Sequence, residues 1–466
     1  MNILHISAEC FPIAKVGGLA DVVGALPKYQ KEIGTTSNVV MPFYNNKFTK
    51  ENSFDKIHEN FIALGHNYYN FKVLKLKDND LGFDIFFIDI PDLTYKEYVY
   101  SNDDTNRFLA FQTATLDWIL SIDNKPDILH VHDHHTGLIP FMVSQCHKYI
   151  ALKDTPTILT IHNAQYQGWF SHNKVNLIPP FDFTKVGLLD WDGSINPLAA
   201  AIKCAWKVTT VSPSYMEELK NNANGLEVLL SHESKKCIGI LNGIDTDVWN
   251  TNTDNRLIEN YTIENAQKGK LANKKWLCEN YNLDIDKPLF AFIGRLVGEK
   301  GADLFPEIFT RALSNNNISI FLLGSGHKET EEKLNKIPKN NFNTFIGYDE
   351  KLAHIIYAAA DFLLMPSRVE PCGLNQMYSL RYGTVPVVNA IGGLKDTIVD
   401  IKDQNGFGIC HKGVTVSIVT NAILRATDFY KDKQTFNNNI QNIMQIDHSW
   451  SNSAREYVNL YNSLKN

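Results

Sequence analysis

The chain has 466 residues, of which 44% are hydrophobic and 21% are charged, and its formal net charge is −6 at pH 7. This composition is typical of a soluble globular protein of two or three domains, and the charge gives no support to binding of nucleic acid or anionic membranes. The 7 cysteines are scattered without a CxxC pair, which favours reduced thiols in the cytosol over a disulfide framework.

The N-terminus enters directly into an expected strand at residues 3–7. It lacks a basic segment followed by an apolar core, so no signal peptide is predicted. No apolar run elsewhere approaches the roughly 20 residues that cross a bilayer. We therefore expect a cytoplasmic protein with no membrane partner and no nucleic-acid partner.

A glycine turn follows this first strand. Lys15 precedes Gly17 and Gly18, and Asp21 lies at the start of a helix with apolar periodicity. The two glycines allow the backbone to approach a ligand closely, and Lys15 places a positive charge beside it. The spacing matches neither a dinucleotide-binding GxGxxG motif nor a P-loop. A glycine-rich turn with a surface lysine is the alternative interpretation.

Several histidines lie at the end of a later expected strand, near residue 130. This strand follows an expected strand at residues 83–89 and an expected helix at residues 107–120. His130 and His132 fall on one face of this strand, and Asp133 and His135 follow it in the turn,. A zinc site is one interpretation of these residues. No distal Cys or His at paired spacing accompanies them, so lining of a pocket or capping of a helix is favoured.

His162 and Asn163 follow a strand at residues 157–160. A His–Asn pair just past a strand suits binding of a sugar, and a structural histidine is the alternative. Asn242 occupies a later Asn-Gly turn, and the polar residues 250–260 predict a domain boundary,.

The second half restarts the alternation of strands and helices. Arg295 and Lys300 lie five residues apart around the turn that follows a strand at residues 288–294. Two such cations can clamp a diphosphate, and a solvated charge pair is the alternative. Tyr348 follows a further strand at residues 344–346, where it is placed to stack on a flat ring,.

Residues 361–397 contain two strand-to-helix turns side by side, after expected strands at residues 362–365 and 385–388. Free N–H groups at helix N-termini attract phosphate, and the crevice at strand C-ends is where α/β proteins bind ligands. Glu370 lies at this edge, where a carboxylate accepts hydrogen bonds from sugar hydroxyls. A surface glutamate in an ordinary βαβ turn is the alternative.

The order of these motifs resembles that of bacterial glycogen synthases and plant starch synthases over essentially the whole chain. The matching blocks are Lys15-Val16-Gly17-Gly18-Leu19-Ala20-Asp21, His130-x-His132-Asp133-x-His135, Thr160-Ile161-His162-Asn163, Leu241-Asn242-Gly243-Ile244-Asp245-Thr246, Gly294-Arg295-Leu296 with Lys300-Gly301, Gly347-Tyr348-Asp349-Glu350, Pro366-Ser367-Arg368 with Glu370-Pro371-Cys372-Gly373-Leu374, Arg381-Tyr382-Gly383-Thr384, Gly392-Gly393-Leu394 and Asp447-x-Ser449-Trp450.

The resemblance implies an α/β protein with two facing Rossmann-like domains, the GT-B arrangement, and a deep interdomain cleft. Residues 1–250 would form the acceptor-side catalytic domain, joined by a C-terminal helix at residues 447–466. Residues 251–446 would form the domain that binds the nucleotide sugar.

The implied activity is transfer of glucose from ADP-glucose to the non-reducing end of an α-1,4-glucan such as glycogen, with retention of configuration. No metal and no cofactor is implied, because fixed cations neutralise the departing diphosphate. The implied catalytic residues are Glu370, His162, Arg295 and Lys300. The implied donor-binding residues are Lys15, Gly17, Gly18, Asp21, Asp133, Asn242, Tyr348, Cys372, Gly373 and Leu374.

Three departures from the family pattern stand out. His134 replaces the usual Trp, the loop at residues 91–106 is shorter, and Tyr378 stands where many related transferases carry a second Glu. The glycogen synthase branch also lacks that Glu, so Tyr378 supports the narrower assignment. The alternatives are a UDP-glucose user, a transferase with a small acceptor, a nucleotide-sugar epimerase of the same fold, and a catalytically dead glucan-binding protein.

Overall fold

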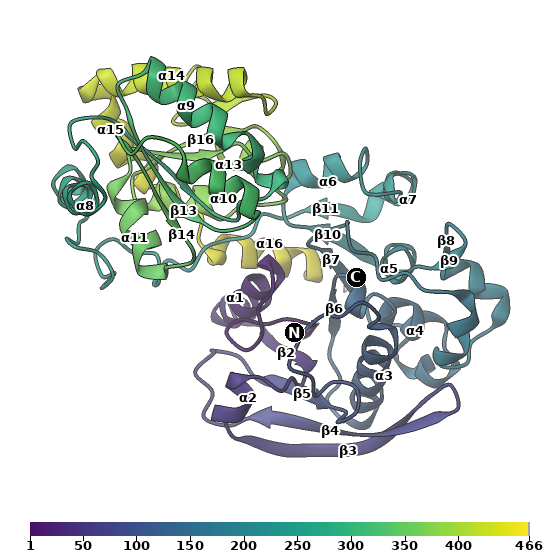
Figure 1. Cartoon of the computed structure of the whole chain (residues 1–466). Helices are drawn as coiled ribbons and strands as arrows, with labels where there is room; N and C mark the ends of the chain where they lie inside the picture. Colours follow the sequence, from purple (N-terminus) through teal and green to yellow (C-terminus); the bar gives the residue numbers. More distant parts are fainter. Residues whose placement is uncertain (465–466) are drawn as a thin grey trace. The chain divides into compact units, whose positions relative to one another are not determined.

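The computed structural model describes residues 1–464, which form two compact units (Figure 1). The first unit contains Met1–Asn242 together with the last segment of the chain, from Trp450 onward. The second unit contains Gly243–Ser449. Each unit is built around one twisted sheet with helices packed against it, as expected for doubly wound α/β proteins.

The sheet of the first unit has nine strands in the order β11-β10-β7-β6-β1-β2-β5-β4-β3. Its strands are β1 (Asn2–Ile6), β2 (Thr36–Pro42), β3 (Phe54–Leu64), β4 (Asn67–Leu76), β5 (Ile85–Asp89), β6 (Ile128–His132), β7 (Thr157–Ile161), β10 (Lys207–Thr210) and β11 (Cys237–Gly239). A separate small pair is formed by β8 (Asp190–Trp191) and β9 (Ser194–Ile195). The central strands are parallel, and nearly all of their residues are buried, His and Thr included, because both faces of the sheet are covered,.

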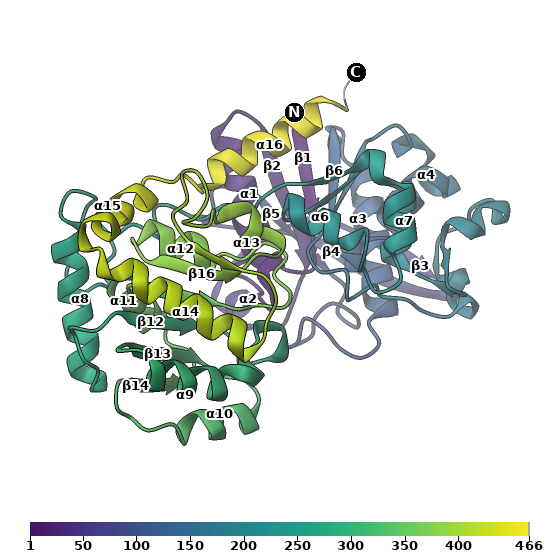
Figure 2. The same cartoon turned by 90° about the horizontal axis from the view of Figure 1, so that it is seen from above.

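The helices of this unit are α1 (Gly18–Glu32), α2 (Lys47–Glu51), α3 (Thr105–Ser121), α4 (Ile139–Gln145), α5 (Pro197–Cys204), α6 (Pro213–Leu219), α7 (Glu227–His232) and α16 (Trp450–Asn462). The C-terminal helix α16 packs beside α1 (Figure 2). Trp450, Tyr457 and Tyr461 of α16 join a core cluster with residues of α1 and of the central strands. The pattern of apolar residues predicts a last helix from residue 447. It begins at Trp450, because Ser449 forms a bridge with Ile244, in which the carbonyl of His448 accepts a hydrogen bond from the N–H of Ile244.

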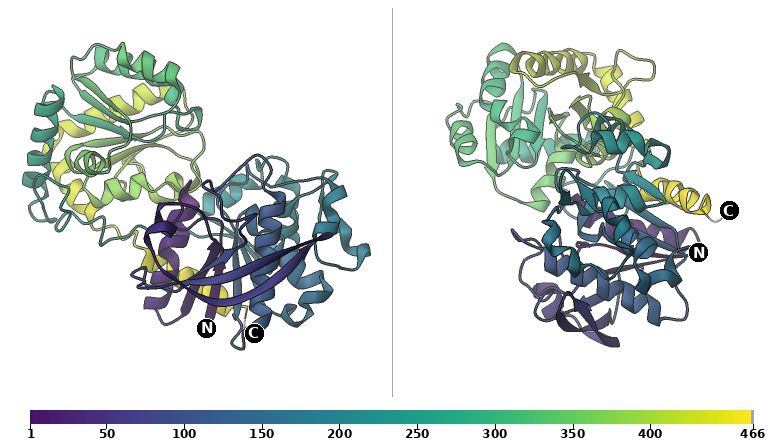
Figure 3. Two further views of the ribbon diagram at one scale, coloured as in Figure 1. Left: turned by 60° about the horizontal axis from the view of Figure 1, so that its bottom comes forward. Right: turned by 90° about the vertical axis from the view of Figure 1, so that its right-hand side faces the viewer.

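A long antiparallel hairpin, β3 and β4, extends one edge of the first sheet and pairs with β5 (Figure 3). The sequence did not predict it. Most residues of β3 are exposed, so this strand lacks the apolar run that identifies a buried strand. Its pairing with β4 therefore becomes visible only in the tertiary structure.

The second unit has a six-stranded parallel sheet in the order β14-β13-β12-β15-β16-β17. Its strands are β12 (Leu289–Ile293), β13 (Ser319–Gly324), β14 (Phe342–Ile346), β15 (Phe362–Met365), β16 (Val385–Asn389) and β17 (Ile409–His411). Its helices are α8 (Ala266–Tyr281), α9 (Phe305–Asn315), α10 (Lys328–Asn335), α11 (Glu350–Ala359), α12 (Asn375–Arg381), α13 (Gly392–Thr397), α14 (Val416–Lys431) and α15 (Lys433–Met444).

Each sheet has a topological switch point, where successive strands are added first on one side and then on the other. The switch lies between β1 and β6 in the first unit and between β12 and β15 in the second. Ligands of open α/β sheets bind outside the carboxyl ends of the strands at such points. We call this side of each sheet its carboxyl edge. The prediction of two Rossmann-like α/β domains is confirmed, and no helix within residues 1–464 is both long and apolar enough to cross a membrane.

Candidate active site

The carboxyl edge of the first unit is organised around Glu9, a buried carboxylate that follows β1. One of its oxygens accepts hydrogen bonds from the backbone N–H groups of Val16, at 2.5 Å, and Gly17, at 3.0 Å. The other oxygen accepts a hydrogen bond from the hydroxyl group of Tyr100. Glu9 therefore fixes the shape of the turn that precedes α1.

This turn presents open backbone and a cation. A Cβ atom added at Gly17 or Gly18 would meet no atom within 4 Å, so the chain here borders free space. Lys15 lies beside it, and its ammonium contacts the carboxylate of Asp21 at 2.7 Å. Both side chains are partly exposed, so the pair is accessible to an anion and contributes little to stability,.

Asp133 and His162 meet where β6 and β7 end. The N–H of His162 donates to the Asp133 carboxylate at 2.7 Å. Burial raises the pKa of Asp133 to about 7, and hydrogen bonds from the N–H groups of His162 and Asn163 oppose the rise. Asp133 also has a φ of 55°. Such backbone strain in a residue other than glycine clusters at functional sites.

A row of three imidazoles runs inward from this edge, and we call it the imidazole row. His162 Nε2 contacts His132 Nδ1 at 3.0 Å, and His132 Nε2 contacts His5 Nδ1 at 3.1 Å. His5 Nε2 contacts Gln30 Oε1 at 2.9 Å. Burial lowers the pKa of His162 to about 3 and that of His5 to about 4, so these rings are uncharged at neutral pH.

The zinc interpretation of this segment is not supported by the geometry. His5, His130 and His132 bring nitrogen atoms within 4.8 Å of one another, but both nitrogens of each ring are engaged in hydrogen bonds. His130 contacts the hydroxyl of Tyr461 at 2.7 Å and that of Thr160 at 2.6 Å. The favoured interpretation, lining of a pocket or capping of a helix, stays a prediction for Asp133, which is the N-cap of the short helix His134–Thr136 but makes no side-chain capping hydrogen bond.

The loop at residues 91–106 contributes Tyr100 to the first unit's site. Besides its bond to Glu9, Tyr100 stacks on His135, with ring centroids 4.6 Å apart. His134, which replaces the family's Trp, packs on His135 and on the Gly168 backbone, where a Cβ would lie 2.3 Å from the ring. This loop therefore holds the residues after β6 in place.

The carboxyl edge of the second unit is organised around Glu370, which follows β15 and is buried. Its carboxylate accepts a hydrogen bond from the Lys300 ammonium at 2.5 Å and from the Ser367 hydroxyl at 2.8 Å. The Lys300 side chain remains 24% exposed. An ammonium has three N–H donors, so Lys300 can bind a further anion while it holds Glu370.

Glycines bring the neighbouring turns into contact with Glu370. A Cβ at Gly301 would lie 2.6 Å from the carbonyl oxygen of Pro366, and a Cβ at Gly392 would lie 2.1 Å from that of Glu370. Gly301 has a φ of 73° and Gly392 a φ of 42°. Only glycine fits these positions. The turn that carries Lys300 and the turn after β16 therefore pack directly against the turn after β15. The two strand-to-helix turns of residues 361–397 thus lie side by side, as predicted.

Arg295 and Tyr348 lie on the same edge but are exposed. The guanidinium of Arg295 is 3.7 Å from Glu299, and 73% of its side chain is exposed, so it is accessible to a ligand. Tyr348 is 85% exposed and follows β14. Since β14 is two strands from β12, Tyr348 lies roughly 10 Å along the edge from the Arg295 turn.

The remaining predicted residues occupy separate positions. Cys372 is buried, Gly373 has a φ of 73°, and Leu374 is the N-cap of α12. Asn242 is buried after β11, three strands from β6, and its side-chain oxygen has no hydrogen-bond partner among the described residues. Tyr378 stacks on Trp249, with ring centroids 3.7 Å apart.

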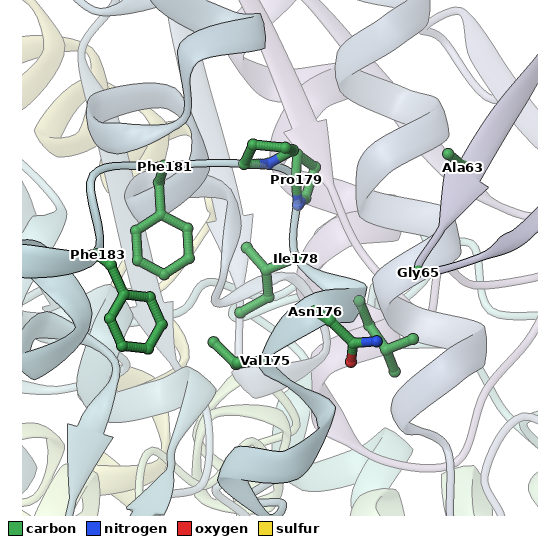
Figure 4. Close-up of a pocket in the computed structure, with 10 residues that line it drawn as sticks. Ala63, Gly65, Val175, Asn176, Ile178, Pro179, Phe181 and Phe183 are labelled. Atoms are coloured by element: carbon green, nitrogen blue, oxygen red, sulfur yellow. The ribbon is translucent and has the colours of Figure 1, made fainter.

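A cavity of about 480 Å³ lies elsewhere in the first unit, between the β3–β4 turn and residues 175–183 (Figure 4). Its lining is mainly apolar, with Phe181 and Phe183 on one side and Ala63 on the other. None of the predicted site residues lines it, so it is separate from the carboxyl edge.

Two functional candidates escaped the sequence interpretation, Glu9 and Tyr100. Glu9 stands directly after a strand and before a glycine turn, which is a usable signal. Tyr100 carries no such signal, because only the fold brings its loop to Glu9.

Comparison with known proteins identifies the family of the chain. Residues 2–232 match the family described as "Starch synthase catalytic domain", and residues 277–441 match "Glycosyl transferases group 1". The chain is 51% identical over 468 residues to a glycogen synthase of Flavobacterium johnsoniae, with 99% of each chain covered. It is 36% identical over 481 residues to a glycogen synthase of Streptococcus pneumoniae, with 100% of each chain covered.

Solved structures show the same relationship. The catalytic domain of starch synthase IV from Arabidopsis thaliana, bound to ADP and acarbose, superposes with a TM-score of 0.89 at 31% identity, and 99% of each chain is covered. A sucrose-phosphate synthase from Thermosynechococcus elongatus shares the fold, with a TM-score of 0.59 at 16% identity. The chain therefore belongs to the glycogen synthase and starch synthase family, and it is a hexosyltransferase of glycogen or starch synthesis.

Proposed function

We propose that this enzyme transfers glucose from ADP-glucose to the non-reducing end of an α-1,4-glucan, with retention of configuration. The second unit binds the nucleotide sugar and the first unit binds the acceptor glucan. The observation that carries this proposal is the pair of Lys300 and Glu370 at the switch point of the second sheet. The ADP and acarbose in the Arabidopsis starch synthase support an adenine donor and an oligosaccharide acceptor.

Lys300, Arg295 and Lys15 act on the diphosphate. When the glucosyl–phosphate bond breaks, the sugar gains oxocarbenium character and negative charge builds on the departing diphosphate. Fixed cations that face this charge lower the barrier, because they are aligned before the reaction begins. The partial exposure of all three side chains supports this role. With these cations in place, we propose that transfer requires no metal and no cofactor.

Glu370 binds hydroxyl groups of the glucosyl unit. One oxygen of its carboxylate accepts hydrogen bonds from both Lys300 and Ser367, so the group is anchored before the donor arrives. The backbone N–H groups of Gly373 and Leu374, at the start of α12, bind phosphate oxygens beside it. The carboxylate thus recognises the sugar, and the cation attached to it acts on the leaving group.

His162 and Asp133 bind the sugar and not the diphosphate. The low pKa of His162 keeps its ring uncharged at neutral pH, so it binds by hydrogen bonding and not as a cation. Asn242 approaches the donor from the same unit, and Tyr348 stacks on the adenine. Retention follows if the acceptor hydroxyl attacks the face that the diphosphate leaves, with a diphosphate oxygen taking the proton.

The test is glucose transfer to glycogen from ADP-glucose and, in parallel, from UDP-glucose, with EDTA present. We expect transfer from ADP-glucose that EDTA does not suppress. Preference for UDP-glucose would reject the donor assignment, and transfer that EDTA abolishes would reject the metal-free clamp. No transfer from either donor by the folded protein would reject the reaction.

The role of Lys300 is tested separately with Lys300→Ala. We expect turnover to fall by about 10²- to 10³-fold, as for loss of one preorganised charge-stabilising group, with a smaller change in the KM for the donor. The matched control is Lys333→Ala on α10, an exposed lysine paired with its helix neighbour Glu329, which should retain wild-type kinetics. Unchanged turnover of Lys300→Ala would reject its role in the transition state.

A further inference from the structure

The imidazole row ends inside the first unit on the amide of Gln30. The carbonyl oxygen of this amide accepts a hydrogen bond from His5 Nε2 at 2.9 Å and from the Ser37 hydroxyl at 2.6 Å. The amide nitrogen donates to the hydroxyl of Tyr461 on α16 at 3.0 Å. Gln30 is fully buried, so water does not compete for these bonds.

A second chain of hydrogen bonds starts from the same amide and fixes its orientation. Tyr461 contacts His130, which contacts Thr160, whose hydroxyl contacts that of Thr209 at 2.6 Å. Thr209 donates in turn to the carbonyl oxygen of Leu159 at 3.3 Å, and a carbonyl can only accept.

We assign the direction of every bond in this second chain from that final acceptor, because the hydroxyl of Thr209 has one proton and the carbonyl of Leu159 can only accept it,. Thr209 donates its hydroxyl proton to the carbonyl and accepts a hydrogen bond from the Thr160 hydroxyl. Thr160 in turn accepts a hydrogen bond from His130 Nε2. His130 Nδ1 then accepts the proton of Tyr461. The Tyr461 oxygen is left to accept from the NH2 group of Gln30, and the Gln30 carbonyl oxygen therefore faces His5.

An acceptor at this end gives the imidazole row one polarity. A neutral imidazole has one donor nitrogen and one acceptor nitrogen. His5 must carry its proton on Nε2, toward Gln30, so its Nδ1 accepts from His132 Nε2. His132 Nδ1 is then left to accept from His162 Nε2. Each ring is neutral because burial lowers all three pKa values.

We propose that Gln30 is a positioning residue that sets the tautomer of His162 through His5 and His132. His162 then holds its proton on Nε2, inside the protein, and presents an unprotonated Nδ1 at the carboxyl edge. This nitrogen has no hydrogen-bond partner among residues 1–464, and 9% of the residue surface is exposed.

The tautomer decides what His162 recognises. An unprotonated nitrogen accepts a hydrogen bond from a hydroxyl group and cannot donate one to a phosphate oxygen. His162 therefore selects a sugar hydroxyl and repels the diphosphate. This consequence rests on the proposed function, whereas the tautomer itself does not.

The direct test is ¹⁵N NMR of the protein with labelled histidine, in the absence of donor and acceptor. The signals of His162 are assigned by comparison with His162→Gln. We expect a protonated Nε2 and an unprotonated Nδ1. A protonated Nδ1 in the wild-type protein would overturn the proposal, whatever the enzyme transfers. The predicted tautomer in a protein that transfers no glucose would instead count against the proposed function alone.

Variants test the role of Gln30. Gln30→Met keeps the shape of the side chain but removes the acceptor, and we expect a mixture of His162 tautomers with turnover reduced about two- to tenfold, twofold being the loss for an equal mixture. The matched control is Ser37→Ala, which removes the other bond to the same oxygen and should retain both tautomer and turnover.

A second variant covers the case in which Gln30→Met does not fold. Tyr461→Phe keeps the ring on α16 but removes the partner of the Gln30 NH2 group, so the amide can rotate. We again expect two forms of His162 in the NMR spectrum. A single Nε2–H tautomer in both variants, with turnover unchanged, would show that Gln30 does not set it.

Discussion

Mild acid should destabilise the first unit, because its fold buries a set of histidines as neutral rings. Burial lowers the pKa of each of them. The set comprises His5, His130, His132, His134, His135 and His162. In the unfolded chain each ring takes up a proton below its ordinary pKa of 6.5, but in the folded unit it does not. The stability that these neutral rings contribute is therefore complete above pH 6.5 and is lost as the pH falls toward 4.

The size of the loss follows from the shifts. At pH 5, a ring whose pKa is lowered to about 4 or 3 reduces the free energy of unfolding by roughly 2 kcal/mol. Each pH unit below 6.5 lowers that free energy by about 1.4 kcal/mol per ring. His5, His134 and His162 have such values, and together they cost roughly 6 kcal/mol. The other three histidines add to this loss.

Asp133 opposes this trend. Its pKa is raised to about 7 in the folded unit, so it binds a proton in the fold before it does so in the unfolded chain. Its contribution to stability grows as the pH falls from 7, by roughly 3 kcal/mol at pH 5. The net loss from the four groups is then roughly 3 kcal/mol, a large part of the 5–15 kcal/mol typical of a domain.

The assay is urea unfolding followed by fluorescence at pH values from 7.5 to 5. The free energy of unfolding should fall with each step below pH 6.5. His162→Gln removes one ring, so the slope should decrease by up to about 1.4 kcal/mol per pH unit. The control is His66→Gln, since His66 is exposed. Equal stability at pH 6.5 and pH 5 would refute the argument that these rings stay neutral in the fold.

Three further substitutions test how the sites are held. Gly392→Ala should lower stability by about 2–4 kcal/mol and reduce transfer, because its Cβ would lie 2.1 Å from the carbonyl oxygen of Glu370,; wild-type urea unfolding and activity would contradict this. Lys270→Met should cost about 3–5 kcal/mol in urea unfolding, since the buried Lys270 Nζ lies within hydrogen-bond distance of three carbonyls and a threonine hydroxyl, which would lose their donor,; an unchanged midpoint would show that these acceptors do not need Lys270. Tyr100→Phe should cost about 1–3 kcal/mol by removing a donor from buried Glu9,, and wild-type stability would show that the backbone amides suffice.

The sequence predicted the strand-to-helix turns that carry the candidate site residues. Strand ends followed by glycines and charges predicted the turns at Lys15, Lys300 and Glu370, because the carboxyl edge of a parallel sheet is where such residues gather. The direct contact of Lys300 with Glu370 was not predicted. It depends on a close approach of two turns that are 70 residues apart in the chain, and no local pattern encodes that distance.

The histidine-rich end of β6 is a second place where the sequence shows the spacing of residues but not their contacts. The spacing of His130 and His132 on one strand face is a property of the strand period, and the sequence shows it directly. Whether such rings bind a metal or each other depends on His5, Gln30 and Tyr461, which come from a neighbouring strand and two helices. The tertiary structure decided in favour of hydrogen bonds.

By itself, then, the sequence determined the α/β class, the central strands and the turns that carry charge, because these follow from apolar runs and from local turn chemistry. Only the tertiary structure decided the β3–β4 hairpin, the place of Glu9 and Tyr100, and the neutral state of the buried histidines. The physical reason is that pairing of exposed strands, contacts across long loops and desolvation of a ring all depend on which distant segments surround a residue.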